Sequence, residues 1–231
     1  MARRQAWLSW SSGKDSAMAL HEVRSAGEID VTGLLTTVNA AAGRVAMHDV
    51  RRVLLEAQAQ ALGLPLHVVE LPWPCPNAVY EQLMSAPLDT ARRHGVSEIV
   101  FGDLFLEDIR AYREASLAGT GLTPVFPLWH RPTGELARQI LACGIRAVIT
   151  CVDPAQAPAA IAGRWYDEAL LAVLAALPSG VDPCGENGEF HTFVTDGPGF
   201  GYPVGVTIGD STERDGFVFI DVLPPDHVIK H

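Results

Sequence analysis

Short apolar runs alternate with amphipathic stretches along most of the chain. Nearly continuous runs of apolar and β-branched residues are typical of strands that a sheet buries on both faces. Such runs predict strands over residues 6–8, 30–38, 66–71, 97–101, 123–129 and 145–152. Apolar residues that recur every three or four positions predict helices from residue 17 and over residues 49–62, 77–94, 107–118, 133–143 and 165–177. The alternation predicts right-handed βαβ units and an α/β fold with a Rossmann-like, doubly wound parallel sheet.

The pattern changes after the strand predicted at 145–152. Residues 153–158 are rich in Pro and Ala and are expected to lead out of the core sheet. We therefore divide the chain into a core domain over residues 1–153 and a smaller C-terminal α+β region over residues 154–231. Two further β-prone runs, 204–208 and 217–221, are separated by a loop that ends in Asp215-Gly216, and they predict a terminal β-hairpin.

Composition narrows the class of protein. The chain has 231 residues, of which 48% are hydrophobic and 19% charged, and this balance predicts a globular protein with a substantial core. The formal net charge of -10 argues against a large surface for nucleic acid, which needs clustered Lys and Arg. Four widely spaced cysteines favour a reducing, cytoplasmic setting. The sequence contains no run of 18 apolar residues, so no membrane span is expected.

The first candidate site follows the first predicted strand. Residues 11–16 read Ser-Ser-Gly-Lys-Asp-Ser and directly precede a predicted helix, so we call them the serine loop. A helix N-terminus has N–H groups without helical partners and a dipole that favours anions, and Lys14 adds a positive charge. The loop is not a Walker A motif, because Leu8 and Asp15 stand where that motif has glycine and Ser or Thr. An ordinary strand-to-helix turn capped by Ser11 or Ser12 is the alternative.

A second group of polar residues follows the strand at 97–101. Ligands bind open α/β sheets outside the carboxyl ends of the strands, where the strand order reverses. If the five parallel strands lie in the order 3-2-1-4-5, the serine loop and residues 102–108 share one crevice. The candidate residues there are Gly102, Asp103, Glu107 and Asp108.

The third group is the acidic segment, residues 182–193, which reads Asp-Pro-Cys-Gly-Glu-Asn-Gly-Glu-Phe-His-Thr-Phe. Loops on a rigid scaffold often display binding and catalytic groups, so a functional site is expected here. Two alternatives remain. The segment could be a polar loop whose side chains cap its own turns, or Cys184, His191 and a carboxylate could bind a metal, although a second close pair of ligands is missing.

These motifs together resemble a known family. The serine loop resembles the Ser-Gly-Gly-Lys-Asp-Ser loop of the PP-loop ATP pyrophosphatases, with Ser12 in place of the first glycine. Phe-Gly-Asp at 101–103 with Glu107, Asp108 and Arg110, Pro-Leu-Trp at 127–129 and Gly-Glu-Asn-Gly-Glu-Phe-His-Thr at 185–192 extend the likeness to the diphthine-ammonia ligase family. That family usually has Tyr where this chain has Phe190.

The resemblance implies an adenine nucleotide α-hydrolase-like core and an ATP-dependent amidation. A carboxylate attacks the α-phosphate of ATP, pyrophosphate leaves, and ammonia displaces AMP from the acyl-adenylate to give an amide. Eukaryotic and archaeal members act on diphthine of translation elongation factor 2. For a bacterial member, the acceptor would be an unknown carboxylate, because bacteria lack diphthamide.

The resemblance also suggests residue roles. The residues expected to bind ATP are Ser11, Ser12, Gly13, Lys14, Asp15, Ser16, His48, Gly102 and Asp103. Asp15 either holds Mg²⁺ or orients Lys14, and Asp103 is a second candidate Mg²⁺ ligand. The acceptor and ammonium are expected to contact Glu107, Asp108, Glu186, Asn187, Glu189 and Thr192. Catalysis is assigned to Lys14, Asp15, Glu186 and His191, with His191 as a general base.

Other functions stay open from the sequence alone. The chain could be a PP-loop enzyme with another small-molecule or tRNA substrate, or a non-catalytic module that binds adenine nucleotides. Paired reactive cysteines or a basic extension would favour a thiolation or tRNA enzyme, and the sequence has neither. His48 could equally be a capping or surface residue. Free ammonium is the expected nitrogen source, and a homodimer is compatible with the sequence.

Overall fold

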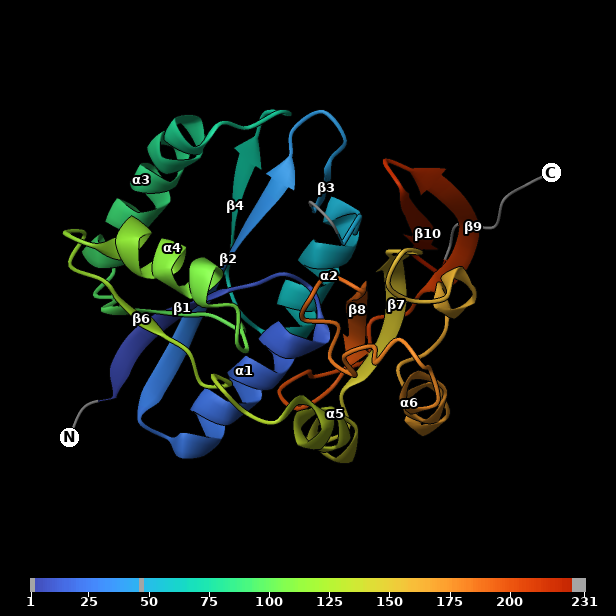
Figure 1. Cartoon of the computed structure of the whole chain (residues 1–231). Coiled ribbons are helices and arrows are strands. Elements are labelled where there is room, and N and C mark those ends of the chain that lie inside the picture. The colour runs from blue at the N-terminus through green and yellow to red at the C-terminus, as the bar shows by residue number, and fades with distance from the viewer. Residues whose placement is uncertain (1–2, 46–47, 226–231) are drawn as a thin grey trace.

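The computed structural model describes residues 3–45 and 48–225. The first two and last six residues of the two predicted regions, and residues 46–47, lie outside this description. Its larger sheet has six strands, of which five are parallel (Figure 1). The parallel strands are β1 (Arg4–Ser9), β2 (Ile29–Asn39), β4 (Leu66–Leu71), β5 (Glu98–Val100) and β6 (Thr123–Val125). They lie in the order β4-β2-β1-β5-β6, which confirms the predicted order and the α/β fold class. The short strand β3 (Arg44–Val45) pairs antiparallel with β2.

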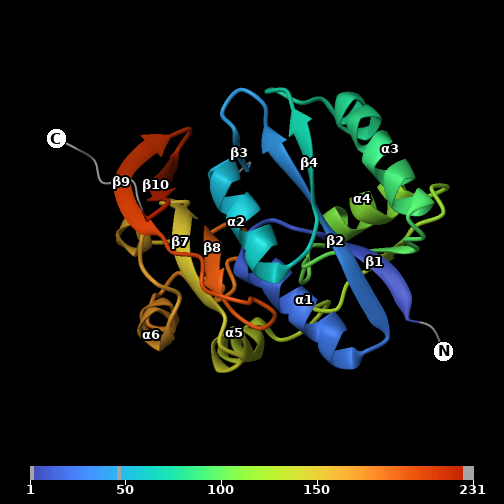
Figure 2. The same cartoon turned by 180° about the vertical axis from the view of Figure 1, so that it is seen from behind.

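Helices cover both faces of this sheet (Figures 1 and 2). They are α1 (Lys14–Ala26), α2 (Arg52–Leu62), α3 (Asn77–Arg93) and α4 (Glu107–Leu117). One apolar core contains Leu20 of α1 and Leu55 of α2, and a separate core contains Leu88 of α3 and Leu117 of α4. The sheet therefore separates two cores, as a doubly wound fold requires.

The second sheet is antiparallel and has four strands. These are β7 (Arg146–Val152), β8 (Phe190–Asp196), β9 (Thr207–Arg214) and β10 (Phe217–Leu223), in the order β8-β7-β10-β9. Helices α5 (Thr133–Ala142) and α6 (Glu168–Ala175) and the short 3₁₀ helix η1 (Ala159–Ile161) accompany it. The predicted terminal hairpin is confirmed, and β9 and β10 are joined at Asp215-Gly216, where both φ angles are positive. Its first strand was placed too early, because β9 covers most of the residues that were predicted as the loop and shares only residues 207–208 with the predicted strand 204–208.

Two expectations about this second sheet were wrong. Strand β7 does not belong to the core sheet, because it pairs with β8 and β10, so residues 153–158 do not lead out of that sheet. A continuous apolar run looks the same in a parallel sheet and in a covered antiparallel one. The last part of the acidic segment is strand β8 and not a loop. The prediction failed there because polar residues in the segment hide the alternating pattern of a strand.

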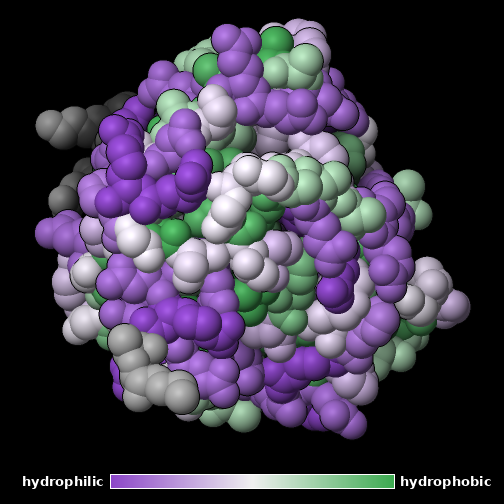
Figure 3. Space-filling model, turned by 90° about the vertical axis from the view of Figure 1, so that its left-hand side faces the viewer, coloured by the Kyte–Doolittle hydropathy of each residue, from purple (hydrophilic) through white to green (hydrophobic). Residues whose placement is uncertain are grey.

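The two sheets share one apolar core. Phe193 of β8 and Val148 of β7 belong to the same buried cluster as Leu20 and Leu55. Strand β8 therefore lies against α1 and carries the acidic segment to the helix that follows the serine loop. From the side of α3 and α4, the molecule shows polar residues over most of its surface with smaller apolar areas between them (Figure 3). Among the described residues, no helix is both long and apolar enough to span a membrane.

Candidate active site

The serine loop turns sharply between β1 and α1. Ser12 is fully buried and has a φ of 72°, in the left-handed region that glycine adopts more readily than serine. The buried side chain of Gln58, on α2, holds this turn. Its Nε2 donates to the Ser12 carbonyl at 3.1 Å and to the Val194 carbonyl of β8 at 2.6 Å, and its Oε1 accepts from Trp10 Nε1 at 2.8 Å.

Lys14 is buried at the start of α1. Its Nζ donates to both carboxylate oxygens of Asp15, at 2.8 and 3.1 Å, and to the carbonyl of Cys184 in the acidic segment. The Nζ also lies 5.5 Å from the ring centroid of Phe190. Burial opposes the charge on Lys14, but Asp15 and other acidic groups outweigh it, and the pKa of Lys14 lies above its ordinary value. Lys14 is therefore a fixed cation inside the site, and Asp15 orients it.

Strand β8 closes the other side of the serine loop. Thr192 Oγ1 accepts a hydrogen bond from the Lys14 backbone N–H at 3.1 Å, and the Thr192 carbonyl lies 3.0 Å from Nδ1 of His48. Because a carbonyl only accepts, Nδ1 carries the proton and Nε2 of a neutral His48 is free to accept one. Burial lowers the pKa of His48 to about 4.

His191 lies next to His48, with ring centroids 4.7 Å apart. Its Nε2 is buried and has no hydrogen-bond partner among the described residues. Burial lowers the pKa of His191 well below its ordinary value, and the nearby His48 and Lys14 add to this effect. Both imidazoles are therefore neutral near pH 7.

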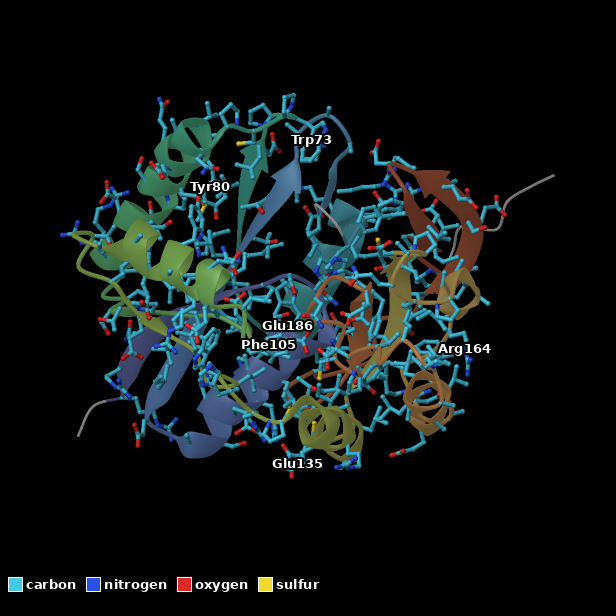
Figure 4. The ribbon with its side chains drawn as sticks, viewed as in Figure 1. Trp73, Tyr80, Phe105, Glu135, Arg164 and Glu186 are labelled. Carbon is cyan, nitrogen blue, oxygen red and sulfur yellow. The ribbon has the colours of Figure 1, made fainter. Side chains whose placement is uncertain are left out.

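Glu186 connects the acidic segment to the loop after β5, and it lies between the two halves of the molecule (Figure 4). Its Oε1 accepts a hydrogen bond from the Leu104 backbone N–H at 2.7 Å. Burial raises the pKa of Glu186 to about 7, and the neighbouring carboxylate of Asp15 contributes. A carboxyl group with this pKa can both accept and donate a proton near neutral pH.

These groups face a single cavity of about 530 Å³. Its polar part is lined by Ser11, Lys14, Asp15, Ser16, His48, Gly102, Asp103, Glu186, His191 and Thr192. Its apolar part lies between α3 and α4 and includes Tyr80, Met84, Leu88, Phe101, Ile109, Tyr112 and Leu117. The structure therefore brings the serine loop, residues 102–103 and the acidic segment together, at the carboxyl ends of β1 and β5.

Two family models match this chain. The diphthamide synthase N-terminal domain matches residues 4–122, and the diphthamide synthase C-terminal domain matches residues 133–221. The chain belongs to the diphthamide synthase family. The N-terminal model contains the serine loop and the C-terminal model contains the acidic segment, so the family resemblance predicted from the motifs is confirmed. A search of curated proteins gave no match.

Membership in the diphthamide synthase family indicates an enzyme of the ligase type, with an activity like that of a diphthine-ammonia ligase. The domains that define the family meet at the cavity. The N-terminal domain supplies the serine loop, His48, Gly102 and Asp103, and the C-terminal domain supplies Glu186, His191 and Thr192.

Several residues predicted for the site lie outside the cavity lining of this diphthamide synthase family member. The Glu107 side chain is 72% exposed and lies 3.2 Å from His130, and Asp108 is also exposed. Asn187 donates to Oε1 of the buried Glu189 at 3.0 Å, so these two residues brace the acidic segment from within. Ser12 and Gly13 shape the serine loop without lining the cavity. Their roles in binding stay predictions.

Sequence reasoning missed some residues that shape the site of this chain. Gln58 was one of them, although it is a polar residue within the buried stripe of α2, beside Leu54 and Leu55. That position was a signal, because a buried amide needs hydrogen-bond partners. The Leu104 N–H and the Cys184 carbonyl were also missed, and backbone groups leave no signal in a sequence.

Proposed function

We propose that this chain is an ATP-dependent amide ligase. The carboxylate of an acceptor attacks the α-phosphate of ATP and pyrophosphate leaves. Ammonia then attacks the activated carbonyl carbon and loses a proton, and AMP leaves as the amide forms. The main support is that the characteristic motifs of both family domains line one cavity.

The polar part of the cavity suits a triphosphate. The first helical hydrogen bond at α1 runs from the Ala17 N–H to the Gly13 carbonyl, so the N–H groups of Asp15 and Ser16 precede it. Such groups and the helix dipole attract anions, and the fixed charge of Lys14 strengthens the attraction. Lys14 would stabilise the charge that develops on the leaving pyrophosphate. The apolar part of the cavity offers a surface for the adenine base.

Mg²⁺ would reach this site together with the nucleotide. Among the described residues, no group of three or more His, Cys, Asp and Glu side chains could hold a metal. Mg²⁺ commonly binds through one or two carboxylates and the phosphates themselves. Asp103 fits this role, because it lines the cavity and its Oδ2 is buried without a hydrogen bond among the described residues; its ion pair with Arg113 Nε is long, at 3.6 Å. Asp15 fits less well, because Lys14 contacts both of its oxygens. The ion would neutralise phosphate charge.

Glu186 is the better candidate for the base that accepts the proton that ammonia loses when it attacks the activated carbonyl carbon. A catalytic base works best when its pKa lies near the working pH, and Glu186 meets this condition at about 7. His191 can accept a hydrogen bond at Nε2, but its low pKa makes it a weak base. We therefore assign proton transfer to Glu186 and the orientation of ammonia or acceptor to His191.

The acceptor would be diphthine on elongation factor 2 where the family activity holds, and another carboxylate otherwise. Acidic groups at the cavity suit an ammonium ion and a trimethylammonium group. A tRNA acceptor is disfavoured, because the formal net charge is -10.

Product analysis tests the proposal. Purified protein would be incubated with ATP, Mg²⁺ and ammonium, with and without an extract of its source. AMP and pyrophosphate that depend on ammonium and extract support the ligase. Formation of ADP, or tight binding of ATP without turnover, would overturn it. A Lys14→Ala variant should lose AMP formation.

A further inference from the structure

His48 lies over the serine loop, just before α2, and residues on either side of it are held by the C-terminal hairpin β9–β10. We call the described residues 44–45 and 48–51 the histidine segment. Its contacts with the hairpin are charged hydrogen bonds between residues about 170 positions apart in the sequence. The hairpin itself does not line the cavity.

Asp221 of β10 binds two arginines of the histidine segment. Arg51 donates to it through Nε at 2.9 Å and Nη2 at 2.6 Å, and Arg44 donates through Nη2 at 2.9 Å. Burial opposes the charge on Asp221, but the two guanidinium groups outweigh it and lower the pKa of this carboxyl. Bidentate Arg–carboxylate pairs are stronger and more directional than ordinary surface ion pairs.

A second set of contacts fixes Asp49, the residue after His48. Arg214 of β9 donates to Asp49 Oδ1 at 2.7 Å. Arg44 donates to the Asp49 carbonyl at 2.8 Å and to Oδ2 at 3.1 Å. Asp49 has a φ of 52°, a left-handed conformation that costs free energy unless its surroundings hold it. The hairpin therefore sets the backbone next to His48.

His48 in turn touches the serine loop closely. A Cβ added to Gly13 would lie 3.0 Å from His48 Cε1, and His48 Nδ1 bonds the carbonyl of Thr192. A shift of His48 would therefore change its contact with Gly13 and the lining of the cavity beside the serine loop.

We propose that Asp221 and Arg214 are positioning residues that hold His48 over the serine loop. The effect on nucleotide binding rests on the proposed function, whereas the position of His48 does not. The deciding test is NMR of the His48 ring in full-length protein, with its signals assigned from a His48→Ala variant. In the wild-type protein, Lys14 of α1 and His191 of β8 face the ring, and we expect no titration between pH 5 and 8.

An Asp221→Asn variant should expose the ring and bring its titration into the range of pH 5–7, and Asp221→Glu should restore the wild-type behaviour. Glu70→Gln is a matched control, because Glu70 also pairs with an arginine, Arg52, but lies on the surface. An unchanged His48 titration in Asp221→Asn would overturn the proposal. Arg214→Gln, which releases Asp49 alone, provides the same test if Asp221→Asn does not fold.

Calorimetry with a non-hydrolysable ATP analogue tests the consequence for the site. We expect about tenfold weaker binding for Asp221→Asn, roughly the effect of 1.4 kcal/mol, and wild-type binding for Glu70→Gln. If the wild-type protein does not bind the analogue, the proposed function fails, while the NMR result still decides whether the hairpin positions His48. If binding is unchanged although the ring titrates, His48 has no part in holding the nucleotide.

Discussion

Ser12 shows how a single residue carries the shape of the serine loop. Its left-handed backbone is unfavourable for serine by about 1–2 kcal/mol, and its Oγ is buried without a hydrogen-bond partner among the described residues. The surrounding bonds from Gln58 and Val194 hold the turn in place. The usual glycine of the related loops would adopt this conformation without strain.

Replacement of Ser12 by glycine should therefore stabilise the protein. We expect a gain of about 1 kcal/mol, because the relief of strain and of the unpaired hydroxyl exceeds the entropy cost of glycine. This corresponds to a rise of about 2–4 °C in the melting temperature, measured by calorimetry. Ser12→Ala removes the hydroxyl but keeps the strain, so it should be less stable than Ser12→Gly. A Ser12→Gly protein that melts below the wild type would contradict the explanation.

Glu186 should give the reaction its pH dependence. A base must be deprotonated to act, and the pKa of Glu186 is about 7, so kcat/KM for AMP formation should rise from pH 6 to pH 8. Glu186→Gln should lower kcat/KM about 100-fold or more and remove this rise. Glu56→Gln, on the exposed side of α2, is the control and should keep the wild-type profile. A rise that persists in Glu186→Gln would assign the titration to another group.

At the scale of elements, the site depends on how closely the end of β5 approaches the first turn of α1. A Cβ on Gly102 would lie 2.9 Å from the Asp15 carbonyl carbon and 3.0 Å from the Ser16 nitrogen. Both atoms are backbone, so they cannot yield without moving the helix. Because Gly102 has no side chain, the end of β5 can pack this closely against the first turn of α1.

Gly102→Ala should accordingly displace the start of α1. We expect the affinity for ATP, measured by calorimetry, to fall at least about tenfold and stability to fall by about 1–3 kcal/mol. Gly134→Ala is the matched control: no atom lies within 4 Å of its added Cβ, and alanine in a helix is favourable by about 0.5–1 kcal/mol. Equal behaviour of the two variants would show that the close approach does not matter.

The five parallel strands of the first sheet could be predicted, because apolar runs alternate with amphipathic stretches in this part of the chain. The two-residue strand β3 is too short to leave such a pattern. The strand order was only supposed from the sequence, and the structure has it. In the second sheet the terminal hairpin could be predicted, but the pairing of β7 with β8 could not, because β7 reads as any buried strand and β8 lies within a polar motif. The partners of Gln58 were also hidden, because Ser12 and Val194 lie 46 and 136 positions away from it in the sequence. The serine loop and the acidic segment were found because the order of their residues resembles known motifs, and not because of their residue types, which are common in turns.

At the scale of the whole molecule, the two family domains share buried polar contacts as well as an apolar core. Gln58 bonds Val194, the Lys14 N–H bonds Thr192, and the Leu104 N–H bonds Glu186. Separation of the domains would leave these groups without partners, at about 1–3 kcal/mol for each that stayed buried. The domains are therefore expected to unfold together.

Thermal unfolding should show a single transition, with tryptophan fluorescence and far-ultraviolet circular dichroism changing at the same temperature. Gln58→Leu leaves Trp10 Nε1 and the Val194 carbonyl without this partner, so it should cost about 2–5 kcal/mol. The melting temperature should then fall by about 5–15 °C. Gln60→Leu, on the exposed face of the same helix, should change it little. Two separate transitions in the wild-type protein would contradict this coupling.

The bond between Gln58 and β8 also limits how the two halves of this chain can be exchanged or engineered. A chimera that keeps residues 4–122 and receives a foreign second half would retain Gln58 and lose the Val194 carbonyl and the Thr192 hydroxyl. Its serine loop would keep its sequence but lose part of its scaffold. A successful graft would therefore have to include a strand equivalent to β8, so the smallest transferable unit is the loop together with that distant strand.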